Sequence, residues 1–123
     1  MVEFAVVAPV FFIFMFAAME FAHLNTLRNT AHNAAYEAAR AAVVPGADKS
    51  QAENEARRIL TAVGTRQFTI AVTDITDDSG EVKVTIDIPY ADNGLMIPWF
   101  TGSVNIHSET TLKTERYTGI PGI

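Results

Sequence analysis

The sequence predicts an α+β fold: one long N-terminal α-helix with an apolar first half, a short second helix, and a three-stranded antiparallel β-meander packed on the C-terminal half of the long helix. Two observations support this class. Residues 4–19 carry no charge and residues 20–42 contain neither glycine nor proline, which favours a continuous helix. From Phe68 onward the hydrophobic pattern changes to a period of two, which is typical of strands. The length of 123 residues allows one domain, or one domain with an appendage.

The long helix is predicted to begin near Phe4, to continue to Val44 and to end before the breaker pair Pro45-Gly46. Small and apolar residues recur at three- and four-residue steps after residue 20, and many are alanine, the best helix former. Such a helix is about 40 residues, or roughly 60 Å, long. Pro9 lies inside it and removes one backbone hydrogen bond, which predicts a kink or a locally melted turn.

The first part of this helix is apolar on all sides, and residues 4–19 hold five of the eight phenylalanines. Sixteen uncharged residues are slightly short of the roughly 20 needed to cross a bilayer. A signal peptide would start with basic residues, whereas here no Lys or Arg precedes Arg28. We therefore expect residues 1–24 to form a hydrophobic helix segment for a membrane or a filament core, and residues 25–123 to form a head domain.

A second, short helix follows. Either Asp48, or Ser50 together with Glu53, is placed to cap its N-terminus. Gly64 is expected to end it. The residues expected on its helical pattern are Ala52, Ala56, Ile59, Leu60 and Val63.

Two alternating stretches, Phe68–Val72 and Val82–Ile88, are predicted to pair as a β-hairpin across the turn Thr76–Gly80. Pro89 closes the second strand. A loop, Ala91–Gly102, then leads to a third strand near Ser103–Thr114. The residues of that strand expected to point to the core are Val104, Ile106 and Leu112.

Composition argues against several classes of function. The net charge is −5 and the nine basic residues are scattered, so nucleic acid is not expected as a partner. The absence of cysteine excludes a disulfide framework and a thiolate metal site. The acidic turn does not follow the spacing of a calcium-binding EF-hand, and a solvated turn is the favoured interpretation. Its residues are Asp74, Asp77, Asp78, Ser79 and Glu81.

No pattern points to catalysis. His23 and His32 are nine residues apart on a helix and cannot share one ion, and His107 falls on a predicted strand, so all three are interpreted as structural, exposed or partly buried side chains. Neither a G-x-S-x-G nucleophile elbow nor a glycine-rich phosphate loop occurs. The sequence therefore predicts a protein that is not an enzyme and that holds no cofactor and no metal.

Alanines form two ridges along the amphipathic part of the long helix. Small residues let helices approach closely. The chain's own sheet is expected to cover part of this surface, with packing between subunits as a second use. The six residues are Ala31, Ala34, Ala35, Ala38, Ala39 and Ala42.

Trp99 and Phe100 stand between Pro98 and Gly102. Packing over the open edge of the small sheet is the favoured interpretation of this aromatic pair, and an exposed contact surface is the alternative.

Glu3 precedes the uncharged run, where a carboxylate is costly in a membrane. It is either an interfacial residue left in water or a buried residue in a helix bundle. In a bundle it would need a cation, and the nearest one is the N-terminal ammonium of a neighbouring subunit.

These residues carry a family resemblance. V-E-F-A-V-V-A-P at residues 2–9 and M-E-F-A at 19–22 resemble the start of TadE-like pseudopilins, components of tight-adherence (Tad) pili in the type IV filament superfamily. A-A-Y-E-A-A-R-A-A, I-P-Y, L-M-I-P-W-F-T-G and T-L-K-T-E-R further along agree with it.

The resemblance implies a pilin-like fold and a structural role. Such a chain is cut by a prepilin peptidase, resides in the inner membrane, and is then incorporated by the pilus assembly machinery into an extracellular or periplasmic filament, with copies of itself or other pilins as partners. The filament would serve surface adhesion or a related secretion machine. The residues assigned to assembly are Glu3, Phe4, Pro9, Phe11, Phe12, Phe14, Phe16 and Glu20, with Trp99 and Phe100 as a surface contact.

One feature departs from the family. The early acid is usually the fifth mature residue, and here it is the third, so we expect either that upstream residues are missing or that processing differs. The positive-inside rule alone would put the C-terminal part in the cytoplasm, whereas the resemblance puts it outside. The alternative function is a membrane-tethered extracytoplasmic binding module that does not polymerise.

Overall fold

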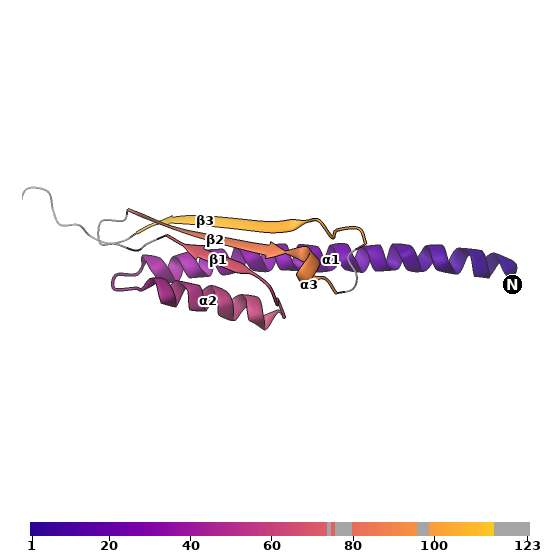
Figure 1. Cartoon of the computed structure of the whole chain (residues 1–123), viewed down its shortest axis with the longest axis horizontal. Helices are drawn as coiled ribbons and strands as arrows, with labels where there is room; N and C mark the ends of the chain where they lie inside the picture. Colours follow the sequence, from indigo (N-terminus) through magenta and orange to yellow (C-terminus); the bar gives the residue numbers. More distant parts are fainter. Residues whose placement is uncertain (74, 76–79, 96–98, 115–123) are drawn as a thin grey trace, which may run out of the picture.

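One helix, α1 (Val2–Val43), runs along most of the molecule and projects beyond the rest of it at its N-terminal end (Figure 1). The computed structural model describes residues 1–73, 75, 80–95 and 99–114. Alongside the C-terminal half of α1 lie a second helix and a three-stranded antiparallel sheet, so the predicted α+β class is confirmed. The elements after α1 are α2 (Lys49–Ala62), β1 (Thr69–Val72), β2 (Glu81–Pro89), the one-turn α3 (Tyr90–Asn93) and β3 (Asn105–Lys113).

The long helix has close to its predicted bounds. It continues through Pro9 without a break, so the locally melted turn is wrong. Pro9 has no backbone N–H, so the carbonyl of Ala5 lacks its usual helical donor. The remaining hydrogen bonds keep the helix continuous despite this loss. At the other end Val44 is extended, at φ −65° and ψ 136°. A residue before proline is pushed out of the α region, so Pro45 ends the helix as expected.

The two ends of helix α2 are set by different residues, Asp48 at the N-terminus and Gly64 at the C-terminus. Asp48 is its N-cap residue, but the Asp48 side chain makes no capping bond to the backbone. The Ser50 hydroxyl donates to Asp48 Oδ2 at 2.8 Å, and this bond lowers the pKa of Asp48. At the C-terminal end, the Gly64 amide bonds to the Thr61 carbonyl and the Thr65 amide to the Leu60 carbonyl. This pair of bonds requires the positive φ of Gly64, 79°, so its predicted stop role is confirmed.

The sheet has the order β1-β2-β3 with both pairs antiparallel, as predicted. Val72 lies opposite Val84, and Ile88 opposite Ile106, so the alternating apolar residues share one face. The expected hairpin turn lies largely outside the described residues. The single helical turn α3 (Tyr90–Asn93) overlaps the start of the expected loop 91–102. The sequence pattern did not indicate this turn.

The core lies between the sheet, α2 and the C-terminal half of α1. All six alanines of the two ridges are fully buried there, at 0% exposure. Because their side chains are short, α1 can lie close to α2 on one side and to the sheet on the other. The second use expected for them, packing between subunits, is therefore wrong for these residues, since none of their surface is free.

Candidate functional site

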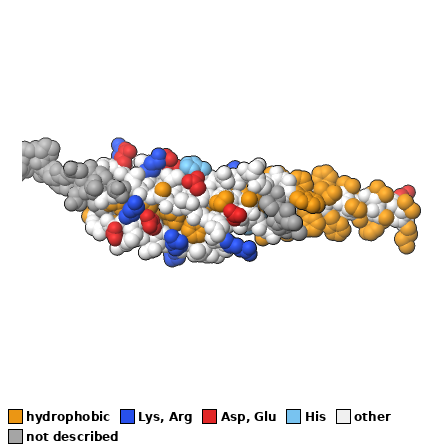
Figure 2. All heavy atoms as spheres, in the orientation of Figure 1, with side chains coloured by type: hydrophobic (Ala, Val, Ile, Leu, Met, Phe, Trp, Pro, Cys, Tyr) orange, Lys and Arg blue, Asp and Glu red, His pale blue; other side chains and the backbone are white. Residues whose placement is uncertain are grey.

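The projecting half of α1 is uncovered. Residues 4–19, here called the apolar segment, extend beyond α2 and the sheet (Figure 1), and their large side chains are exposed; Figure 2 shows one face of this apolar surface. Seven consecutive residues from Val10 to Phe16 are exposed, and seven residues complete almost two helical turns. A helix that is hydrophobic all round is covered by lipid or by other helices. α1 is long and apolar enough to cross a membrane, and none of its most apolar window is buried.

Glu3 lies in the first turn of α1, where a negative charge interacts favourably with the helix dipole. Its side chain is exposed. Among the described residues no cation lies within ion-pair distance of it, and no Lys or Arg precedes Arg28 in the chain. Within the described residues Glu3 thus has no partner. Whether its carboxylate meets water or a neighbouring subunit depends on the assembly.

Glu20, at the other end of the apolar segment, is bonded within the chain. Glu20 Oε1 accepts hydrogen bonds from the amide of Thr101, at 3.0 Å, and from the Thr101 hydroxyl. Thr101 is itself buried. The sequence assigned Glu20 to assembly together with Glu3, but the structure uses this carboxylate to fasten the segment before β3 to α1.

Tyr90 makes a second bond at the same junction. Its hydroxyl donates to the backbone carbonyl of Glu20 at 3.0 Å, and its ring lies 6.0 Å from that of His23. Burial raises the pKa of Tyr90, and the negative charge of Glu20 adds to this shift. The phenol therefore remains a hydrogen-bond donor at neutral pH, which keeps α3 against α1.

Asn93, also buried, holds α3 to its surroundings. Its side-chain oxygen accepts from the amides of Arg66 and Gln67, and its amide donates to the carbonyls of Gln67 and Pro89, all within 3.1 Å. His23 Nε2 donates to the Asn93 carbonyl at 2.9 Å. Sequence reasoning did not single out Tyr90, Asn93 or Thr101, because all of their partners except Pro89 are 26 to 81 residues away along the chain.

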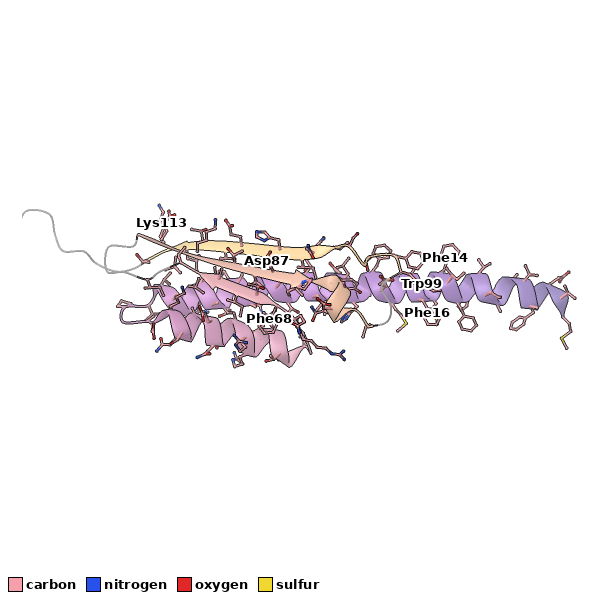
Figure 3. All side chains as sticks on the ribbon, in the orientation of Figure 1. Phe14, Phe16, Phe68, Asp87, Trp99 and Lys113 are labelled. Atoms are coloured by element: carbon pink, nitrogen blue, oxygen red, sulfur yellow. The ribbon has the colours of Figure 1, made fainter. Side chains whose placement is uncertain are left out.

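Trp99 and Phe100 are exposed, at 81% and 53%. The expectation that they pack over the sheet edge is wrong in the single chain, and the alternative, an exposed surface, describes them. Figure 3 draws Trp99 at the level of Phe14 and Phe16 along the molecule, where the head meets the projecting helix.

The remaining polar groups form no catalytic arrangement in the described part of the chain. His32 Nδ1 lies 3.1 Å from the Ser108 hydroxyl, and His107 Nδ1 lies 2.6 Å from Asp87 Oδ1 across the β2–β3 pair. No group of three His, Asp or Glu residues that could hold a metal occurs there. Four residues of the acidic turn, Asp74, Asp77, Asp78 and Ser79, lie outside the described residues.

An open groove of about 440 Å³ separates parts of α1 and α2. Its one charged lining side chain, Arg58, is ion-paired with Glu55 at 2.6 Å, and this contact lowers the pKa of Glu55. The groove thus lacks the second titratable group that acid–base chemistry needs.

Comparison with known proteins finds similarity in the region of α1. The family model described as TadE-like protein matches residues 1–40. No curated protein and no solved structure is significantly similar to the chain. The matched residues contain the whole apolar segment, Glu3, Glu20 and most of the alanine ridges. Over residues 1–40 the chain is therefore similar to the TadE-like family, which confirms the predicted resemblance for this part of α1.

Proposed function

We propose that the chain is a structural, non-enzymatic subunit of a Tad-type, type IV pilus-like filament. The observation that carries this proposal is the apolar segment, which bears a TadE-like sequence and is uncovered on all sides. The subunit is held in the inner membrane by this segment, processed by the prepilin peptidase, and assembled by the pilus machinery with copies of itself or other pilins. The filament is exported to the periplasm or cell surface, where it serves adhesion or a secretion machine.

The apolar segment needs a non-aqueous environment both before and after assembly. Fully burying one Val, Ile, Phe or Met side chain contributes about 1.5–3 kcal/mol, and eleven such residues of the segment are exposed. From Glu3 to Glu20 the helix rises by about 26 Å, close to the ~30 Å hydrocarbon thickness of a bilayer. Lipid covers the segment in the membrane, and the helices of neighbouring subunits cover it in a filament core.

The charge of Glu3 is what makes the filament core differ energetically from the lipid bilayer for this helix. Hydrophobic burial is similar in lipid and in a helix bundle, so it gives little preference for the filament. A carboxylate inside the bundle is stabilised only when it meets a cation. The N-terminal ammonium of a neighbouring subunit is such a cation, and it lies at the same end of the helix as Glu3. We therefore assign Glu3 the role of pairing with the next subunit.

Replacing Glu3 tests this role. In Glu3→Ala and Glu3→Gln the neighbour's ammonium is buried without its partner, which costs about 3–5 kcal/mol per contact. At ~1.4 kcal/mol per tenfold, filament yield should fall by a factor on the order of 100 or more. Negative-stain imaging of the purified material measures the fibres, and membrane fractionation measures insertion, which should be unchanged.

Glu81→Gln is the matched control, because it removes the same charge at an exposed position of β2 in the head. That variant should form filaments normally. Normal filament yield from both Glu3 variants would contradict the proposal.

A further inference from the structure

The segment that leads into β3 carries an exposed apolar surface. Leu95, Trp99 and Phe100 are exposed at 61%, 81% and 53%. From Gly94 to Ile106 the sequence contains no Asp, Glu, Lys, Arg or His. Exposed aromatic side chains in an uncharged stretch are compatible with lipid and unfavourable in water. We call Trp99 and Phe100 the aromatic surface.

This surface is fixed in place by its neighbour Thr101. The amide and hydroxyl of Thr101 bond to the Glu20 carboxylate, and the Thr101 carbonyl accepts from the Val104 amide at 3.0 Å. Trp99 and Phe100 immediately precede Thr101, so they lie beside α1 close to Glu20. Figure 3 places Trp99 level with Phe14 and Phe16, the last phenylalanines of the apolar segment.

The position along α1 matches a membrane boundary. Glu20 is the first charged residue after Glu3, and 16 uncharged residues separate the two. When the apolar segment spans a bilayer, the hydrocarbon ends close to Glu20 and the head lies outside. Tryptophan concentrates at this boundary, because its ring is apolar and its N–H binds water or headgroups. The bonds from Thr101 to Glu20 hold the nearby Trp99 close to that boundary.

We propose that the aromatic surface inserts into the headgroup region of the membrane and anchors the head on the bilayer before assembly. The proposal rests on the membrane residence that is part of the proposed function. The occupant is the lipid interface, because Trp99 lies level with the last phenylalanines of the apolar segment (Figure 3) and its neighbour Thr101 is bonded to Glu20, the residue at the boundary. A second attachment point beside α1 would fix the head's rotation about the spanning helix.

Trp99 is the one tryptophan of the sequence, so its fluorescence reports on this position alone. The full chain is reconstituted in phosphatidylcholine vesicles that contain lipids brominated either near the headgroup or near the chain end, and iodide serves as the aqueous quencher. The expected result is a blue-shifted emission that is quenched more by the shallow bromines than by the deep ones, and only weakly by iodide.

Two double variants calibrate the depth. Trp99→Phe/Phe12→Trp moves the probe to the middle of the apolar segment, where the deep bromines should quench it most. Trp99→Phe/Tyr36→Trp moves it to an exposed position of α1, 49% exposed and about 24 Å beyond Glu20, where iodide should quench it most. All three replaced side chains are exposed in the chain, so the head should fold in each variant.

The outcomes separate the two proposals. If the probe at position 12 escapes lipid quenching, the apolar segment is not in the membrane, and membrane residence fails together with the anchor. If that probe is quenched by deep bromines while Trp99 is quenched by iodide as strongly as the probe at position 36, the anchor alone is overturned. A blue shift at Trp99 without lipid quenching, which grows with the protein-to-lipid ratio, would show that a second copy covers the surface and would also overturn the anchor.

Discussion

Glu3 and Glu20 are the same residue type at the two ends of one uncharged run, yet their surroundings differ. Glu20 receives two hydrogen bonds from Thr101, and its backbone carbonyl receives a third from Tyr90. Glu3 is exposed, without a described donor or cation. A carboxylate with donors is satisfied within its own chain, whereas one without donors is available to another molecule. This difference is why we assign an assembly role to Glu3 and a fastening role to Glu20.

Replacing Glu20 should loosen the junction. Hydrogen bonds to a charged group contribute about 1.5–3 kcal/mol, so Glu20→Ala should lower the free energy of unfolding of the head by about that amount, and Glu20→Gln, which keeps an acceptor, by less. Denaturant unfolding of the full chain in detergent, followed by circular dichroism, gives the values. Hydrogen exchange at the Thr101 amide should accelerate in both variants.

Glu109→Gln provides the comparison for Glu20. It removes the carboxylate that pairs with Lys83 at 2.9 Å between side chains 45% and 42% exposed, and such surface pairs contribute about 0–1 kcal/mol. Equal losses of stability in Glu20→Ala and Glu109→Gln would argue against a fastening role.

At the scale of elements, α1 is one helix with two kinds of surface. Its first half exposes large apolar side chains, and its second half buries small ones against α2 and the sheet. The periodicity of the sequence predicted both halves and the alternating strands, because these patterns are local. It missed α3, since a single turn of four residues is too short to show a period. It also left open what covers the alanine ridges, which depends on how closely α2 and the sheet approach.

Enlarging one of these alanines tests the packing. Ala38 is at 0% exposure, so Ala38→Leu adds three carbon atoms where no space is free and should destabilise the head by about 1–3 kcal/mol. Ala62→Leu makes the same change at an exposed position of α2 and should alter stability by no more than about 0.5 kcal/mol. Thermal unfolding of the two variants measures the difference. Equal stability of both would mean that α1 does not pack as closely as described.

At the scale of the whole molecule, the projecting part of α1 joins the head close to Glu20. There Tyr90 of the head contacts two residues of α1, Glu20 and His23. Charged side chains are spread over the head, and apart from the acid at its tip the projecting helix is apolar (Figure 2). This arrangement fits a subunit whose helix enters a bundle. It is equally the shape of a tethered binding module, so the sequence of the apolar segment has to decide between them.

Exchanging the apolar segment separates these functions. Residues 4–19 are replaced by an unrelated leucine–alanine transmembrane helix of equal length, with Glu3 and Glu20 retained. We expect normal membrane insertion and an unchanged melting temperature of the head, but no filaments, because the packing of neighbouring helices depends on side-chain shape. If filaments or the biological activity of the chain survive the exchange, the helix serves only as an anchor and the binding module is supported.

The sequence by itself determined the elements of this protein, because helical and strand periodicity, breaker residues such as Pro45 and Gly64, and the uncharged run are all local properties of the chain. It also determined the TadE-like character of residues 1–40. Only the tertiary structure decided which contacts Glu20 makes, that Trp99 is exposed, and that the alanines are buried. Glu20 meets a threonine 81 residues away, and that contact holds the neighbouring Trp99 at the end of the head from which α1 projects. No periodicity encodes such a contact, because it depends on where two distant segments come together in the fold.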